Sequence, residues 1–259
     1  MTRYIRKSIS LFFGVVLAVN LAPAIGAESS SLEDRKQAIM DIEDRASADA
    51  LERKERSDAR LESEGVPVND WLPAIEGEAE ARRRSVEEIA WRAMALLTVA
   101  LKGEGLEQAV IEDIVRKYSL AAHFSPAETA FIEDPDPSQH DRVQFTWRYE
   151  AAWVMLWALG YVDDLGMPTD ICDPGKAVVV MRDRNPEQFI VDSKLRPLSE
   201  ILDETDLMYR YHWAVVDARL NGRSPPADLE PGVTMERHYA LNWLIGYLDQ
   251  EWDDVTTDT

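Results

Sequence analysis

The chain has 259 residues, of which 46% are hydrophobic and 29% are charged, and its formal net charge is −20 at pH 7. Nucleic acids and anionic lipid surfaces carry charge of the same sign, so both are excluded as expected partners. The length and apolar content suffice for one domain with its own core, and the single cysteine, Cys172, rules out an intrachain disulfide.

The first 27 residues follow the order of a secretory signal peptide. Basic side chains lie within residues 3–7, an apolar run covers 11–19, and small residues continue to Ala27. The apolar run is short for a membrane span of about 20 residues. We therefore predict an exported protein, periplasmic or secreted in a bacterium, that is cleaved near Ala27. If residues 8–27 stayed uncleaved, they would anchor the chain to the membrane instead.

The next segment, residues 28–64, is dense in charge and contains neither glycine nor proline. Opposite charges stand four positions apart, as in Asp41 and Arg45, a spacing that stabilises a helix by roughly 0.3 kcal/mol per pair. The apolar stripe is thin, which predicts a solvated helix that is dispensable for folding. A short coiled-coil arm is the alternative. Gly65 ends the segment.

Residues 65–259 are predicted to form one mainly α domain, a bundle-like array of helices. Capping-box sequences at Ser85–Glu88 and Ser125–Glu128 begin two of these helices, and Gly103 is expected to stop the first. The remaining helices are expected over residues 106–118, 141–159, 198–220 and 234–251.

One region allows two interpretations. Asp173 and Pro174 favour the start of a helix, whereas residues 177–181 are rich in β-branched side chains that favour a strand. We therefore allow at most a minor strand pair near 177–191 in an otherwise helical domain.

Polar side chains concentrate within the apolar helices of the C-terminal half, where an unpaired polar group is costly. In the 198–220 helix, Asp203, Asp206, Arg210 and Asp217 fall within an arc of about 60°. This strip either touches water or forms an internal carboxylate–guanidinium network that faces a cleft.

His212 lies on the apolar side of the same helix, where a histidine is usually a buried structural residue. In the last helix His238 and Asn242 lie one turn apart, so they either hold one ligand together or bond to each other at a packing seam. Arg148 and Glu150 point to opposite sides of their helix, and each needs its own partner. We expect Arg210 or Arg237 for Glu150, and Asp206 or Glu236 for Arg148. The candidates for a ligand site or polar network are therefore Arg148, Glu150, Asp206, Arg210, His212, Asp217, Glu236, Arg237, His238 and Asn242.

Zinc-protease, nucleotide-binding and serine-hydrolase motifs are absent from the sequence. No pair of histidines or carboxylates has a spacing diagnostic of a metal site, so we expect no metal and no other cofactor. Cys172 stands between Asp170 and Asp173, which would raise its pKa and disfavour a nucleophilic role. The acidic balance would suit a cationic partner, although solubility alone explains such a charge.

Three long stretches resemble the bacterial family known as domain of unknown function 4272. They are WRYEAAWVMLWALG at 147–160, LRPLSEILDETDLMYRYHWAVVDARLNG at 195–222 and ERHYALNWLIGYLDQEWDDVTTDT at 236–259. The resemblance extends back through SVEEIAWRAMALLTVAL and FSPAETAFI, and so covers roughly residues 65–259. It implies a mostly helical single domain and no particular reaction, because no activity or catalytic residues are assigned to the family.

Two functions of different class remain. The first is a non-enzymatic binding or interaction protein for an unknown small molecule or protein. The second is a hydrolase-like enzyme that uses the Arg/Asp/Glu/His cluster of the C-terminal helices, and a structural role in the cell envelope is a lesser candidate. Convergence of the polar residues on an open cavity would favour a ligand or substrate, whereas pairing in a closed interior would favour a scaffold.

Overall fold

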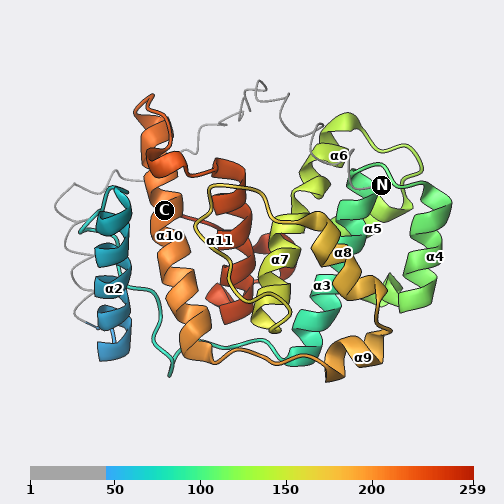
Figure 1. The fold of residues 1–259 in the computed structure, drawn as a ribbon, viewed down its shortest axis with the longest axis horizontal. Coiled ribbons are helices and arrows are strands. Elements are labelled where there is room, and N and C mark those ends of the chain that lie inside the picture. Colours follow the sequence, from blue (N-terminus) through green and yellow to red (C-terminus); the bar gives the residue numbers. More distant parts are fainter. Residues whose placement is uncertain (1–44) are drawn as a thin grey trace, which may run out of the picture.

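The computed structural model describes residues 45–259, so the predicted signal peptide and the first part of the predicted arm lie outside the described residues. Within this range every regular element is a helix, which confirms the mainly α fold (Figure 1). The α-helices are α2 (Ala48–Glu64), α3 (Val86–Gly103), α4 (Gln108–Tyr118), α5 (Pro126–Glu133), α6 (Gln139–Thr146), α7 (Arg148–Ala158), α8 (Pro174–Arg182), α9 (Pro186–Val191), α10 (Leu198–Leu220) and α11 (Pro231–Ile245). Short 3-10 turns are η3 (Leu120–Ala122), η4 (Pro226–Asp228), η5 (Tyr247–Asp249) and η6 (Trp252–Asp254).

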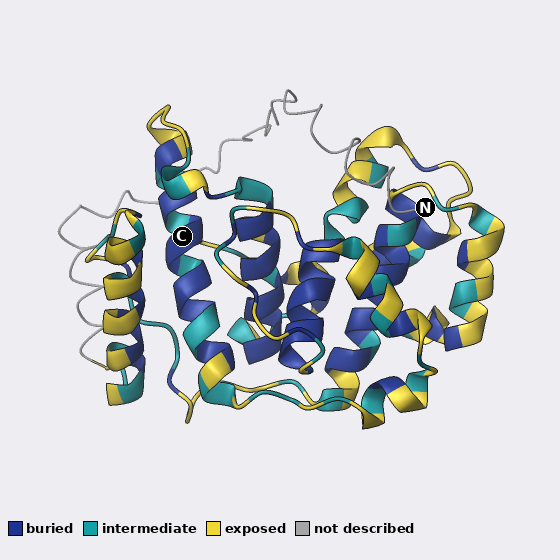
Figure 2. Ribbon diagram, viewed as in Figure 1, coloured by how far each residue is buried: buried dark blue, intermediate teal, exposed yellow. Residues whose placement is uncertain are grey.

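The helices form an array in which neighbours in space are often distant in sequence. Helices α2, α10, α11, α7 and α3 follow one another across the molecule, and α4, α5, α6, α8 and α9 surround α3 or border it (Figure 1). Every residue of α7 from Tyr149 to Ala158 is buried, as is most of α3 (Figure 2). A helix that is apolar around its whole circumference belongs at the centre of a domain, and α3 packs directly on α7.

Both predicted capping boxes are present. The Ser85 hydroxyl accepts the backbone N–H of Glu88, and the Glu88 carboxylate accepts the backbone N–H of Ser85. Ser125 and Glu128 make the same reciprocal pair at the start of α5. Gly103 is the last residue of α3 rather than a residue beyond it. A Cβ atom there would lie 2.7 Å from the backbone of α6, so glycine allows the two helices to touch.

The predicted helix over 141–159 is two helices, α6 and α7, which meet at Trp147. The Thr146 hydroxyl donates to the Arg142 carbonyl, and the Glu150 N–H donates to the Trp147 carbonyl three residues earlier. A threonine hydroxyl bonded in this way tends to bend a helix, and the bond of Glu150 spans three residues rather than the four of an α-helix. The side chain of Trp147 then packs on Gly232 at the start of α11.

The region near 177–191 contains helices α8 and α9, not a strand pair. Asp173 caps α8 by accepting the N–H of Lys176, and Pro174 occupies the first turn. Ala177 and Met181, one helical turn apart, are the buried residues of this helix. Capping and this spacing therefore outweigh the strand preference of the β-branched residues between them.

The last helix differs from the prediction at both ends. It begins at Pro231 rather than at Thr234, because the Glu230 side chain accepts the N–H of Gly232 and proline starts a helix well. It ends at Ile245 rather than near 251, because Gly246 adopts the left-handed conformation with φ 68°.

Helix α2 differs from the solvated arm expected through residue 64. Its buried face, which includes Arg53 and Leu61, packs on α10. The Tyr211 hydroxyl donates to Glu64, and Arg53 lies 3.1 Å from Asp203. Residues 48–64 are therefore part of the packed domain.

We expect a chain that begins at Val66 to melt at a temperature roughly 10 °C or more below that of a chain beginning at Arg45. Loss of α2 exposes the apolar side of α10 and strips Arg210 of Asp58, and each kcal/mol shifts the melting temperature of a domain this size by about 2–4 °C. Thermal melts followed by circular dichroism measure the difference. Equal melting temperatures would show that α2 is the dispensable arm that the sequence indicated.

Candidate functional site

The central polar pair joins α7 to α11. Arg237 lies 3.1 Å from Glu150, and both side chains are buried. Arg237 also donates to the carbonyls of Leu165 and Gly166, while Glu150 accepts the backbone N–H of Cys172. One ion pair thus fixes two helices and the loop that follows α7. We expected Arg210 or Arg237 as the partner of Glu150, and the structure shows that the partner is Arg237.

A second pair joins the same two helices. Arg148 Nη1 lies 3.0 Å from Glu236, one of the two partners expected for it. The Arg148 guanidinium also lies over the rings of Tyr239 and Trp252, at 4.8 and 5.6 Å from their centroids. Burial raises the pKa of Glu236, and Arg148 opposes this by stabilising the ionised carboxylate.

The third cluster lies between α10 and α2. Arg210 forms a two-pronged pair with Asp206 at 2.8 and 3.0 Å, and its Nη1 lies 3.3 Å from Asp58 of α2. Arg210 and Asp206 are 1% and 0% exposed. The internal network expected on this helix is therefore present, but it faces α2 and not a cleft.

The two other carboxylates of the predicted strip lie nearer to water. Asp203 pairs with Arg53 and Arg56 of α2. Asp217 pairs with Arg223 just beyond the end of α10 and accepts a hydrogen bond from Asn221. Asp217 therefore holds the end of its own helix and does not join the other predicted site residues.

The two histidines of the predicted site contact each other. Nδ1 of His212 on α10 and Nδ1 of His238 on α11 are 2.9 Å apart, so one ring donates and the other accepts. Burial lowers the pKa of His212 from its usual 6.5 to about 4 and that of His238 to about 3. Asn242 does not share this contact, because its amide donates to the carbonyl of Thr256.

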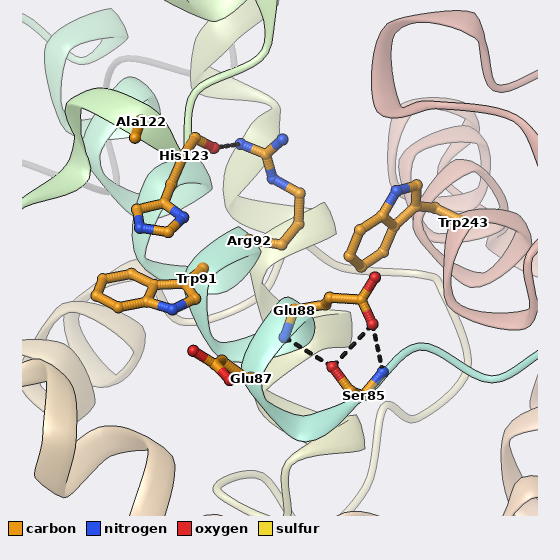
Figure 3. Close-up of a pocket in the computed structure, with 8 residues that line it drawn as sticks. All are labelled: Ser85, Glu87, Glu88, Trp91, Arg92, Ala122, His123 and Trp243. Atoms are coloured by element: carbon orange, nitrogen blue, oxygen red, sulfur yellow. Dashed lines mark hydrogen bonds between the residues drawn. The ribbon is translucent and has the colours of Figure 1, made fainter.

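An open cavity lies elsewhere, at the N-terminal end of α3 (Figure 3). Its volume is about 400 Å³, and none of the predicted site residues lines it. The lining residues are Ser85, Glu87, Glu88, Trp91, Arg92, Ala122, His123 and Trp243. In Figure 3 the His123 imidazole lies flat on the Trp91 indole, and the ring centroids are 3.9 Å apart at an angle of 4°.

Most polar groups of this cavity already form hydrogen bonds or ion pairs within the protein. Ser85 holds Glu88 through its N–H and hydroxyl, which lowers the pKa of the Glu88 carboxyl. Arg92 pairs with the buried Glu128 and donates to the carbonyl of His123. Burial, with Arg92 nearby, lowers the pKa of His123 and so favours its neutral ring, while Glu87 opposes this.

Sequence reasoning missed this cavity because its walls come from three distant segments: α3, the turn η3 with His123, and α11. Ser85 and Glu88 were recognised as a helix cap only. The one feature of the sequence that could have indicated a cavity is Trp91, which follows Glu87 by one turn on an apolar helix. A tryptophan in this position equally indicates a core residue.

The described residues contain no group of three or more histidines, cysteines, aspartates and glutamates arranged to hold a metal ion. None of the helices between residues 45 and 259 is long and apolar enough to cross a bilayer.

The fold and the buried ion pairs define a mainly α protein in which arginine–carboxylate pairs join the helices of the core. The family model described as Domain of unknown function (DUF4272) matches residues 53–255, and the chain belongs to this family. The match begins within α2, in agreement with the packing of that helix on α10. No curated protein and no solved structure matches the chain.

The Arg210 network should be essential for stability. Replacing Arg210 with alanine leaves Asp206 charged, fully buried and unpaired, so we expect a loss of about 3–5 kcal/mol in the free energy of unfolding. The control is Arg219→Ala on the exposed side of the same helix, which should lose less than about 1 kcal/mol. Denaturant melts compare the two. Similar losses for both variants would mean that Asp206 finds another partner or takes up a proton.

The histidine pair should make the protein less stable in acid. Because the folded pKa values lie below the unfolded value, the unfolded chain binds protons first, and stability falls as the pH drops below about 6.5. Relative to His212→Asn, the wild type should lose roughly 2–3 kcal/mol of unfolding free energy between about pH 7 and about pH 4. Denaturant melts across this range test it. Parallel pH curves would show that His212 titrates normally in the folded state.

Proposed function

We propose that the protein is an exported, non-enzymatic binding protein whose small-molecule ligand occupies the cavity lined by Trp91, His123 and Trp243. The main observation behind this proposal is that the buried polar groups and the cavity lie in different parts of the molecule. The acid–base groups of α7, α10 and α11 are paired inside the core, whereas a cavity that these groups do not line is open and presents the rings of Trp91, His123 and Trp243. The volume of this cavity lies within the range of about 300–1,000 Å³ that is usual for small-molecule sites.

Among the described residues the cavity also lacks the activated serine that a nucleophilic hydrolase uses. The Ser85 hydroxyl bonds to the Glu88 carboxylate and accepts the Glu88 backbone N–H, and no hydrogen bond among the described residues joins it to His123. Nucleophilic catalysis requires a base within hydrogen-bond reach of the nucleophile and a third group that orients the base. Ser85 is instead fixed as a helix cap, and His123 is stacked on Trp91.

Support for export comes from the sequence alone. The basic, apolar and small residues of the first 27 positions follow one another as in a cleaved secretory signal. A binding protein outside the cytoplasm would meet its ligand there. The non-enzymatic part of the proposal is supported separately, because the sequence contains no recognisable catalytic motif.

Native mass spectrometry of the chain expressed in full in a bacterium tests both parts together. We expect the exported species to have the mass of a chain cleaved near Ala27 and to carry an additional small-molecule mass. Ala122→Trp, which fills the cavity from an exposed position, should be exported equally but without that additional mass.

Three results would contradict the proposal. A cytoplasmic protein that retains Met1 would contradict the proposed export. A bound mass that persists in Ala122→Trp would place the ligand elsewhere. Turnover of an ester or phosphate substrate that is lost in His212→Asn would favour the hydrolase-like alternative.

A further inference from the structure

We propose that the cavity at the start of α3 binds a small organic cation of the quaternary ammonium type, with the Glu87 carboxylate as the counter-charge and the Trp91 indole as the aromatic surface. This inference rests on the proposed function and adds the chemical class of the ligand. Recognition of such cations by an aromatic ring together with a carboxylate is an established physical combination, because the ring face is electron-rich.

Glu87 is the carboxylate of the cavity that is left without a partner. Glu88 is held by Ser85 and lies 3.7 Å from Arg84, and Glu128 is held by Arg92. Among residues 45–259, Glu87 has no hydrogen bond and no ion pair, and it is exposed at the mouth of the cavity. A ligand cation would therefore meet a carboxylate that no basic side chain of the described residues neutralises.

Trp91 is the aromatic surface that remains available. The Arg84 guanidinium already lies over the ring of Trp243, at 4.8 Å from the ring centroid. Trp91 has His123 stacked on it, yet its side chain is only partly buried. The low pKa of His123 keeps the stacked ring neutral, so the imidazole adds no repulsion toward a cation.

An anionic ligand fits the same cavity poorly. Arg92 is the cation among the lining residues, but it is 7% exposed and its Nη2 is engaged by Glu128 and the His123 carbonyl. Its Nε is buried and has no hydrogen-bond partner among the described residues, so a ligand would not reach it. The net charge of −20 also attracts cations and repels anions over a longer range.

The test uses choline and its neutral carbon isostere, in which a tert-butyl group replaces the trimethylammonium group. Each is titrated into the isotope-labelled protein while the tryptophan indole N–H signals are followed by NMR, and Trp91→Phe assigns the Trp91 signal. We expect choline to shift that signal with a dissociation constant at least about fivefold below that of the isostere.

A matched pair of variants isolates the charge. Glu87→Gln should weaken choline binding several-fold and leave the isostere unchanged. Glu187→Gln is the control, because Glu187 is also an exposed glutamate in the first turn of a helix, α9, but does not line the cavity. It should bind both probes like the wild type.

The outcomes separate this inference from the proposed function. Equal affinity for choline and the isostere, or full choline affinity in Glu87→Gln, overturns the cation assignment and leaves the cavity as a ligand site. If neither probe shifts the Trp91 signal, the cation assignment also falls. The absence of any bound mass in the exported protein would then remove the proposed function as well.

Discussion

Each arginine buried in this helical core faces a carboxylate, and the arrangement of the helices depends on that pairing. Arg53, Arg92, Arg210 and Arg237 are all less than a tenth exposed, and each lies within ion-pair distance of an aspartate or glutamate. A buried pair adds little net stability compared with apolar side chains of the same size, but removing one partner costs about 3–5 kcal/mol. The pairs therefore select one packing of the helices by penalising the others.

The same constraint separates structure from function in this molecule. Most of the groups that attract attention in the sequence are held in contacts between helices: α7 with α11, α10 with α2, and α10 with α11. Groups committed in this way are not free to bind a ligand without a loss of stability. The ligand site proposed above, the cavity at the start of α3, is instead a place where side chains remain partly exposed.

That cavity depends on a helix cap. Ser85 and Glu88 satisfy each other's backbone groups at the start of α3, so the helix begins at a defined residue beside the cavity. Trp91 follows one turn later on the same side as Glu87. The short turn η3 then brings His123 over Trp91, and α11 supplies Trp243 from the other side (Figure 3).

The sequence by itself determined most of the helical segments and some of the interior polar residues, such as Glu150 and Arg210, but it did not show that Arg53 is buried. Capping boxes, prolines in first turns and left-handed glycines act within a few residues, so they can be recognised without knowledge of the fold. The tertiary structure alone decided that Arg210 meets Asp58 of α2, that Glu150 pairs with Arg237, and that an open cavity lies at Trp91. These outcomes depend on which helices pack together, and helical periodicity fixes the face of a residue but not the helix opposite it.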